Sequence, residues 1–437
     1  MGMSTVNIAA PLSLAVRRWY ALGILTAVYI SNIADRFVMS TLIEPIKQDL
    51  HLTDTAIGFL TGTALAIFYT GMGIPLGLIA DRVDRRKLIA LSIALWSLMT
   101  AACGAANTFG QLMLTRIGVG IGEAGGTPAS QSMLADLFPF SQRILATSIF
   151  ALGAAAGSMF GSSVGGTVAD AFGWRAAFLA LAVPGIGLAV LMRFTVREPT
   201  RDACDKSSRG DAASFVDTLK FVRSQRSLFH VLAAGTVVTY WGWGLLWWTP
   251  AFLMRTHAMT AAQAGSLLGT VNGIGGAVGI VVGCLMTHRL ARQDPRWQLW
   301  VVGIATLLGT VASIGLFVGN TLSLTLVSLW LFVPVAYLNI PPILSLTQSL
   351  ALPRMRALAC AMLLFGANIA NLALAPQLIG ILSDVLSAGS GDTARSLRIA
   401  LLLNTVTGFW AVYHFWAVGR TLRPDLERAG VQLSHAE

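Results

Sequence analysis

The stretch WYALGILTAVYISNIADRFVMST, residues 19–41, is apolar along nearly its whole length but carries Asp35 and Arg36. A helix of roughly 20 apolar residues spans a lipid bilayer, and a charge at its centre costs on the order of 2.5–3.5 kcal/mol. A charge kept at that cost indicates either a path for an ion, proton or substrate, or an ion pair that locks helices together. Because Asp35 and Arg36 are adjacent, they point in different directions, so at least one of them should have a partner on another helix.

A second apolar run, residues 109–134, contains Arg116 and Glu123. The two residues are seven positions apart, so two helical turns place both on one face of a helix, about 10 Å from each other. The same two interpretations, a transport path or a structural ion pair, apply to this helix.

The whole composition is typical of a membrane protein. Of the 437 residues, 55% are hydrophobic and 11% are charged, whereas about 25% are charged in ordinary globular proteins. Twelve apolar segments follow one another along the chain. The first is long and contains charges rather than a cleavage site, which argues against a signal peptide.

The net charge of +10 suggests a nucleic-acid partner, but the placement of the basic residues argues against one. With twelve spans and a cytoplasmic N-terminus, most arginines fall on the cytoplasmic side. The basic residues that fall outside are Lys47, Arg175, Arg255, Arg395 and Arg398. This asymmetry is the positive-inside pattern, so we expect a bacterial cytoplasmic membrane with both termini in the cytoplasm. No metal and no cofactor is expected, because the cysteines are scattered and none has a metal-ligand spacing.

The longest polar stretch, residues 193–227, divides the chain into two halves, residues 1–192 and 228–420, with a tail of residues 421–437. Within the linker, residues 214–223 have apolar side chains near one helical face, which predicts an amphipathic helix on the cytoplasmic surface.

The halves resemble each other. A shift of 207 residues aligns Thr53 with Thr260, and a shift of 214 aligns Asp170 with Asp384. Repeats of this kind are typical of secondary transporters, with the site at the repeat interface. We therefore predict an all-α membrane protein with twelve transmembrane helices in two pseudo-symmetric six-helix bundles. In the fifth span, glycines recur every four residues from position 153 to 165, which indicates close helix packing or a sliding interface between the halves.

The loop between spans two and three reads GLIADRVDRRK, residues 77–87. It resembles the G-x-x-x-D-R-x-G-R-K loop of the major facilitator superfamily, with Asp84 in place of the usual glycine. A charge network there can hold the cytoplasmic side shut, whereas the plainer interpretation is a solvated basic loop. The predicted gate residues are Gly77, Asp81, Arg82, Arg85, Arg86, Asp136 and Arg143.

Three further elements resemble spinster-like transporters: residues 32–36 (NIADR), 116–124 (RIGVGIGEA) and 173–178 (GWRAAF). The resemblance is concentrated in residues 25–200. Within it, Glu123 in the sequence Gly-Glu-Ala best distinguishes spinster-like transporters from neighbouring families of organic-anion symporters. In that family the acidic residues of spans one and four are implicated in proton coupling. The resemblance thus implies that Asp35 and Glu123 carry protons here.

The second half has no acidic residue within an apolar span but offers aromatic and amide groups. Trp247 and Trp248 lie near a span end, which favours an interfacial aromatic belt. Trp243 lies deeper and is either core or pocket. The predicted substrate-binding residues are Asn32, Arg36, Arg116, Trp243, Asn272, Asn339 and Asn368.

These features predict a proton-coupled secondary active transporter that works by alternating access. Arg36 and Arg116 would alternately pair with the two carboxylates or hold an anionic head group, while the charge-poor second half contacts an apolar body. The expected substrate is an amphiphilic anion, which the resemblance narrows to a lysolipid or sphingoid phosphate. The alternative is proton symport of a small organic acid, such as a sugar acid or an aromatic carboxylate.

Other classes of protein fit the sequence less well. A membrane-embedded enzyme would need a cluster of His, Asp or Cys at a membrane face or a soluble catalytic domain, and the sequence has neither. A channel is disfavoured because paired halves and a gate loop suit alternating access, and a non-transporting receptor remains open. We expect a monomer in the lipid bilayer, with protons and a small-molecule or lipid substrate as its partners and no nucleic acid.

Overall fold

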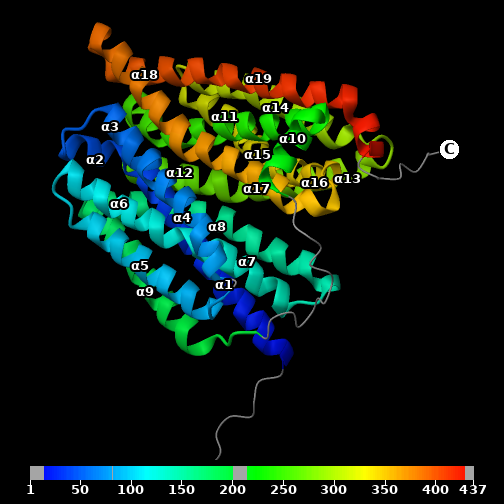
Figure 1. Cartoon of the computed structure of the whole chain (residues 1–437). Coiled ribbons are helices and arrows are strands. Elements are labelled where there is room, and N and C mark those ends of the chain that lie inside the picture. Colours follow the sequence, from blue (N-terminus) through cyan, green and yellow to red (C-terminus); the bar gives the residue numbers. More distant parts are fainter. Residues whose placement is uncertain (1–13, 81, 200–213, 429–437) are drawn as a thin grey trace, which may run out of the picture.

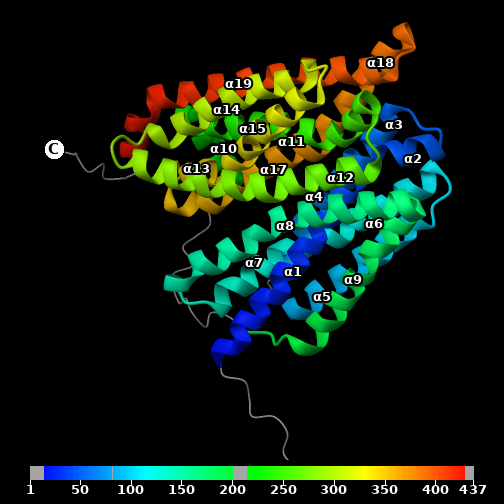
Figure 2. The same ribbon diagram turned by 180° about the vertical axis from the view of Figure 1, so that it is seen from behind.

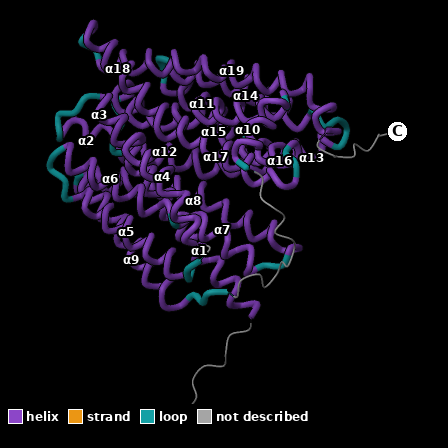
Figure 3. The backbone as a smooth tube through the Cα atoms, in the orientation of Figure 1, coloured by secondary structure: helices purple, strands orange, loops and turns teal. Residues whose placement is uncertain are grey.

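The structure, a computed structural model, describes residues 14–80, 82–199 and 214–428. These residues are helical apart from short loops and turns, and they contain no strand (Figure 3). The first half consists of α1 (Leu14–Thr41), α2 (Ile43–Asp49), α3 (Asp54–Gly58), η1 (Phe59–Thr63), α4 (Ala64–Ala80), α5 (Arg85–Gly104), α6 (Phe109–Ala124), α7 (Gly126–Leu137), α8 (Phe140–Phe172) and α9 (Trp174–Thr195). The linker contributes α10 (Phe215–Ser224). The second half consists of α11 (Arg226–His257), α12 (Ala261–Thr270), η2 (Val271–Gly275), α13 (Gly276–Ala291), α14 (Trp297–Val318), α15 (Leu322–Leu338), α16 (Ile340–Leu350), η3 (Pro353–Met355), α17 (Arg356–Asn368), η4 (Ile369–Leu374), α18 (Ala375–Ser390) and α19 (Thr393–Arg428).

The predicted transmembrane helices are present. Ten helices of the described chain are long and apolar enough to cross a membrane. Two more helical segments occupy the fourth and seventh positions: α6 with α7, which meet at Gly125, and α11. The fold prediction of twelve spans in two bundles is therefore confirmed.

The two halves lie against each other and are joined most closely at one end. Figures 1 and 2 show the halves meeting near α2, α3 and α18 and diverging toward the end where α19 finishes. We call the first the Asp54 end and the second the linker end. Between the halves, α8 packs against α12 and η2, while α18 packs against α3 and η1.

Three spans that contact the other half contain a wider π-helical turn: η1, η2 and η4. Such turns often occur at functional sites. Within η1, a Cβ at Gly62 would overlap the carbonyl oxygen of Leu372. In α8, a Cβ at Gly166 would overlap the carbonyl oxygen of Ala261. Glycine at these two positions is what allows the backbones of the two halves to touch.

The predicted repeat appears at the Asp54 end as two matching contacts between the halves. The Asp384 carboxylate of the second half accepts hydrogen bonds from the amides of Asp54 and Thr55, at 3.0 and 2.7 Å. The Asp170 carboxylate of the first half accepts equivalent bonds from Ala261 and from the next amide, at 3.1 and 2.9 Å. Each aspartate thus satisfies free amides at a helix N-terminus of the opposite half.

An ionic cluster reinforces this end. Arg255 of α11 donates to both carboxylate oxygens of Asp54, at 2.8 and 2.7 Å, and to Glu44 at 2.6 Å. Lys47 lies 2.6 Å from Asp54, and Ser383 of α18 donates to Asp54 at 2.6 Å. Because Arg255 and Ser383 belong to the second half, the cluster holds the halves together.

The structure describes part of the predicted linker and part of the predicted tail. The amphipathic helix is present as α10, with Phe215 exposed and Val222 buried. The last helix runs to Arg428, and near its end Asp425 accepts a hydrogen bond from the amide of Ser227 at 2.9 Å. Residues 200–213 of the predicted linker and 429–437 of the predicted tail lie outside the described residues.

Candidate functional site

Four charged side chains from α1 and α6 form two ion pairs inside the first half. Asp35 Oδ2 lies 3.5 Å from Arg116 Nη1. Arg36 donates through Nε to Glu123 Oε2 at 2.8 Å, and its Nη2 lies 2.7 Å from the same oxygen. The adjacent residues of α1 therefore point to different residues of α6, and both have the partner on another helix that the sequence required of at least one.

Close packing on the other side of α1 orients this helix. Gly157, Gly161 and Gly165 of α8 have no room for a Cβ against Ile33, Ala34 and Val38 of α1. The predicted glycine stripe therefore packs within the first half and does not form the sliding interface between halves. The contact of α8 with the second half uses a neighbouring face, where Gly166 meets α12.

The Asp35–Arg116 pair is the deeper of the two. Arg116 is not exposed, and the Asp35 side chain is 4% exposed. Thr100 of α5 donates to Asp35 Oδ1 at 2.6 Å. Among the described residues, however, none of the three guanidinium nitrogens of Arg116 has a hydrogen-bond partner. A buried guanidinium held by one 3.5 Å contact is poorly compensated for its lost hydration.

The Arg36–Glu123 pair is partly open. Glu123 is fully buried, but the Arg36 side chain is 13% exposed. The Arg36 guanidinium also lies over the ring of Tyr69, 4.7 Å from its centre, which is a cation–π contact. Glu123 Oε1 has no hydrogen-bond partner among the described residues. Of the two predicted substrate-binding arginines, this structure leaves Arg36 accessible and encloses Arg116.

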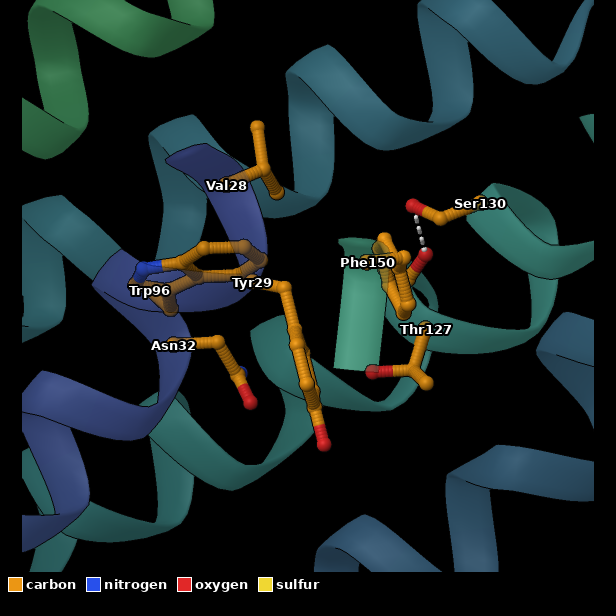
Figure 4. Close-up of a pocket in the computed structure, with 8 residues that line it drawn as sticks. Val28, Tyr29, Asn32, Trp96, Thr127, Ser130 and Phe150 are labelled. Carbon is orange, nitrogen blue, oxygen red and sulfur yellow. Dashed lines mark hydrogen bonds between the residues drawn. The ribbon is translucent and has the colours of Figure 1, made fainter. Parts of the chain in front are cut away.

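Asn32 lies one turn before this cluster and lines a small cavity in the first half. The cavity, with a volume of about 10 Å³, is bounded by α1, α5, α7 and α8 (Figure 4). Tyr29 stacks on Phe150 there, with ring centres 4.6 Å apart. The space holds about one water molecule, so it is too small for a substrate in this state.

Aromatic side chains form the matching region of the second half. The ring of Trp243 lies 4.9 Å from that of Tyr337 and 6.0 Å from that of Phe37 in α1. Tyr337 donates to Ser158 of α8 at 3.3 Å, which joins the halves. Phe37 was not among the residues predicted from the sequence. Its position next to Arg36 is the sequence feature that could have identified it.

Trp247 and Trp248 are buried and do not form the predicted aromatic belt. Trp247 donates to Asn371 at 2.8 Å, and Trp248 donates to the carbonyl of Pro376 at 3.1 Å. Trp247 also contacts Phe37 across the halves, with ring centres 5.2 Å apart. The belt prediction was wrong because α11 lies in the core of its half, where both indole N–H groups find partners.

The predicted amides are placed in different surroundings. Asn272, in η2, is buried, and its Oδ1 has no partner among the described residues. Asn339, between α15 and α16, is buried and donates to the carbonyl of Ala336 at 2.9 Å. Asn368, at the end of α17, is partly exposed. Asn368 is thus the accessible one of the three in this state.

The predicted gate loop forms ion pairs within the first half. Arg85 donates to Asp136 at 2.6 Å and to Glu198 at 2.7 Å, and Glu198 also accepts from the Arg86 amide at 2.9 Å. Asp84 accepts from the Lys87 amide at 3.1 Å and begins α5. Burial alone would raise the pKa of Asp84, but the hydrogen bond from Lys87 and the Arg86 charge outweigh it and lower the pKa. Glu198, which follows the last span of this half, was not predicted as a partner.

The other gate residues lie around this cluster. Gly77 is in α4, and Arg82 is exposed in the loop that follows. Arg143 donates to carbonyl oxygens at the end of α7, at 3.1 and 3.2 Å. Asp81 lies outside the described residues. The described partners of Arg85 and Arg143 lie in the first half or directly after its last span, and none of them belongs to the second half. This agrees with the divergence of the halves at the linker end.

Two six-helix bundles, a pair of matched contacts between them and buried charges in one core define a multi-pass membrane protein of the secondary-transporter class. The model of the Major Facilitator Superfamily matches residues 25–376. The chain belongs to this superfamily and is a spinster-like transporter within it. It is therefore a membrane transporter and not an enzyme.

Similar proteins support this placement over nearly the whole chain. An "MFS-type efflux pump" of Mycolicibacterium smegmatis is 34% identical and aligns over 94% of this chain and 95% of its own length. "Protein spinster homolog 1" of Xenopus tropicalis is 26% identical over 93% of this chain and 81% of its own length. A solved structure of a bacterial homologue of the human lysosomal transporter Spinster, inward-facing and unoccupied, has a TM-score of 0.85 and 25% identity. That similarity covers 95% of this chain and 99% of the other.

Proposed function

We propose that this transporter is coupled to protons and moves an amphiphilic or organic anion by alternating access. The observation that carries the proposal is the double ion pair, Asp35–Arg116 and Arg36–Glu123, buried between α1 and α6. Carboxylates held at membrane depth beside arginines are typical of proton relays and substrate sites in transporters.

The partly exposed pair supplies the coupling. Arginine stays protonated in proteins, so Arg36 loses its counter-charge when Glu123 takes up a proton. A phosphate or carboxylate on the substrate replaces that counter-charge and binds Arg36 through charge-assisted hydrogen bonds. Proton and anion binding then favour each other, and the linkage is reciprocal.

The deeper pair, Asp35–Arg116, responds after the Arg36–Glu123 pair. Protonation of Asp35 leaves Arg116 buried without a counter-charge, which favours a state in which the contact between α1 and α6 has opened. We propose that Arg116 contacts the anion only in that state. The protein could instead exchange its substrate for protons. In that case a cationic part of the substrate would displace the proton from the carboxylate.

The substrate class follows from the aromatic side chains around Arg36 and at the contact between the halves. Tyr69 lies against the Arg36 guanidinium, and Phe37, the next residue of α1, contacts Trp243, which packs on Tyr337. A charged group beside aromatic surface suits an anion with an apolar body, such as a lysolipid or sphingoid phosphate. The alternative is a small organic acid, for which Arg36 alone would supply most of the recognition.

We propose that the linker end faces the cytoplasm of a bacterial cell, with both termini on that side. The positive-inside pattern supports this orientation. The Asp54 end is then the outer end, and the contacts of Asp54, Arg255 and Asp384 keep it closed. In this orientation the described state is closed at its outer end. In the outward-facing state the gate residues around Arg85 would hold the cytoplasmic end closed.

Two measurements on purified protein test the proposal. A thermal-shift screen of lysolipid and sphingoid phosphates against sugar acids and aromatic carboxylates identifies a ligand, because binding to the folded state raises its melting temperature. Affinity for that ligand is then measured against pH. Symport of an anion with one proton predicts binding up to about tenfold tighter for each pH unit lowered, and exchange predicts the reverse sign. Affinity independent of pH, with Arg116→Ala and Arg36→Ala still binding normally, contradicts both versions.

A further inference from the structure

A groove on the second half lies away from the charge cluster of the first half. It is found at the linker end, where α13, α14 and α16 contact one another, and its volume is about 360 Å³. Figures 1 and 2 place α13 at the end where α19 finishes. The groove is lined by Cys284, Thr287, His288, Arg292, Gln298 and Ser345, together with Pro341 and Pro342.

The groove is basic. No carboxylate of the described residues lies within ion-pair distance of His288 or Arg292, and the acidic residue nearest along the chain, Asp294, instead contacts Arg423 at 2.9 Å. Thr287 is 7% exposed, and its hydroxyl has no hydrogen-bond partner in the described chain. Gln298 of α14 donates to Ser345 of α16 at 3.2 Å across the groove. The walls thus offer positive charge and unused polar atoms for an anion.

The surroundings place the groove at the depth of lipid headgroups. Trp297 and Trp300, at the start of α14, meet edge to face with ring centres 5.7 Å apart. Tryptophans at helix ends are typical of the membrane–water interface. From the groove toward the membrane centre, α13 presents an apolar strip whose members are each 42% to 54% exposed: Val278, Val281, Val282, Leu285 and Met286.

We propose that this groove binds the headgroup of an anionic phospholipid. Arg292 and His288 contact the phosphate, Thr287 and Ser345 hydrogen-bond to the rest of the headgroup, and the acyl chains lie along the apolar strip of α13. The positive charge of the groove and its position at headgroup depth favour an anionic phospholipid, because basic pockets between transmembrane helices bind acidic headgroups.

The same site has a structural consequence for the tenth span. Pro341 and Pro342 have no amide hydrogen, so the carbonyls four residues earlier lack their helical donors where α15 passes into α16. A headgroup that contacts both α13 and α16 would hold this break in one geometry. The proposal is independent of the proposed substrate and proton chemistry, and either can fail alone.

Lipid binding by the purified full chain tests the proposal. Phosphatidylglycerol and phosphatidylcholine with identical acyl chains are titrated separately, and bound lipid is counted by native mass spectrometry. We expect saturable binding of phosphatidylglycerol and at least about fivefold weaker binding of phosphatidylcholine. Equal binding of the two lipids contradicts the proposal.

Three variants localise the site. Arg292→Gln should weaken phosphatidylglycerol binding about fivefold. Ser345→Phe fills the groove without changing the charge and should weaken it at least as much. Arg289, in the last turn of α13, lies one turn before Arg292 and does not line the groove. Arg289→Gln removes the same charge, so binding should be unchanged. If Arg289→Gln matches Arg292→Gln, or if Ser345→Phe has no effect, attraction to the surface as a whole explains the binding and the groove does not.

Discussion

The two halves share one fold, yet their cores hold opposite chemistry at matching positions. The shift of 207 residues that aligns the early spans pairs Arg36 with Trp243, and the shift of 214 that aligns the later ones pairs Glu123 with Tyr337. In the first half these positions form an ion pair with an N–O distance of 2.7 Å. In the second half they form an aromatic pair with ring centres 4.9 Å apart.

This difference separates two tasks within one repeated architecture. A charge pair responds to protons, whereas an aromatic pair offers apolar surface whose properties are independent of pH. Changes in the first-half pair should therefore alter the pH dependence of transport, and changes in the second-half pair should alter affinity alone. Four sets of variants test this division, and the change that each set should cause is smaller than that of the set before it.

The strongest effect is expected for the carboxylates of the first half. Asp35→Asn and Glu123→Gln should each reduce proton-driven accumulation in proteoliposomes to the level of liposomes without protein. Exchange of substrate down its own gradient should persist, because alternating access itself needs no proton. Asp49→Asn, which removes an exposed partner of Arg175, is the matched control. Full pH-driven uptake by both core variants would show that the carboxylates do not couple.

The second effect concerns stability. Arg116→Leu leaves Asp35 buried without a counter-charge, which should lower the free energy of unfolding by about 3–5 kcal/mol at neutral pH. The loss should shrink as the pH falls, because a protonated Asp35 needs no counter-charge. Arg175→Leu breaks an exposed pair and should cost about 1 kcal/mol or less. Denaturation in detergent measures both, and equal losses would remove the distinction between the core pair and the surface pair.

The third effect tests the aromatic pair. Trp243→Ala should weaken substrate binding about tenfold, from the loss of about 1–2 kcal/mol of aromatic contact. The dependence of substrate affinity on pH should be the same in this variant as in the unmodified chain. Trp410→Ala, on an exposed face of α19, serves as the control for loss of a tryptophan. A changed slope in Trp243→Ala would mean that the two halves do not divide the tasks.

The weakest effect is expected for the contact that joins the two cores. Tyr337→Phe removes the hydrogen bond to Ser158 but keeps the ring, so the equilibrium between states should shift by about 0.5–1.5 kcal/mol. Reactivity of a cysteine introduced near Arg255 reports opening of the outer end. Ser158→Ala should give the same shift, and the double variant should add nothing. Additive shifts would show that the two groups act separately.

Much of the fold could be predicted because it depends on local patterns. Apolar length located the spans, and the aligned pairs Thr53–Thr260 and Asp170–Asp384 indicated the repeat. Both threonines begin a helix by accepting an amide hydrogen bond, as such residues do at N-caps. Both aspartates bind helix ends of the opposite half.

The remaining features depend on contacts between distant segments. The sequence placed four charges at membrane depth but did not show which arginine meets which carboxylate, since that depends on how α1 rotates against α8. Glu198 as a partner of Arg85, and the burial of Trp247, likewise arise only when separate helices come together. Periodicity along one chain carries no information on such pairings.

The proposed mechanism depends above all on a linkage between substrate binding and proton binding through the ion pairs of the first half. Calorimetry in buffers of different ionisation enthalpy counts the protons exchanged when a ligand from the thermal-shift screen binds. We expect a clear proton exchange for the unmodified chain, its loss in Glu123→Gln, and the same exchange as the unmodified chain in Trp243→Ala. No proton exchange in the unmodified chain, or an undiminished one in a variant lacking both Asp35 and Glu123, would contradict the mechanism.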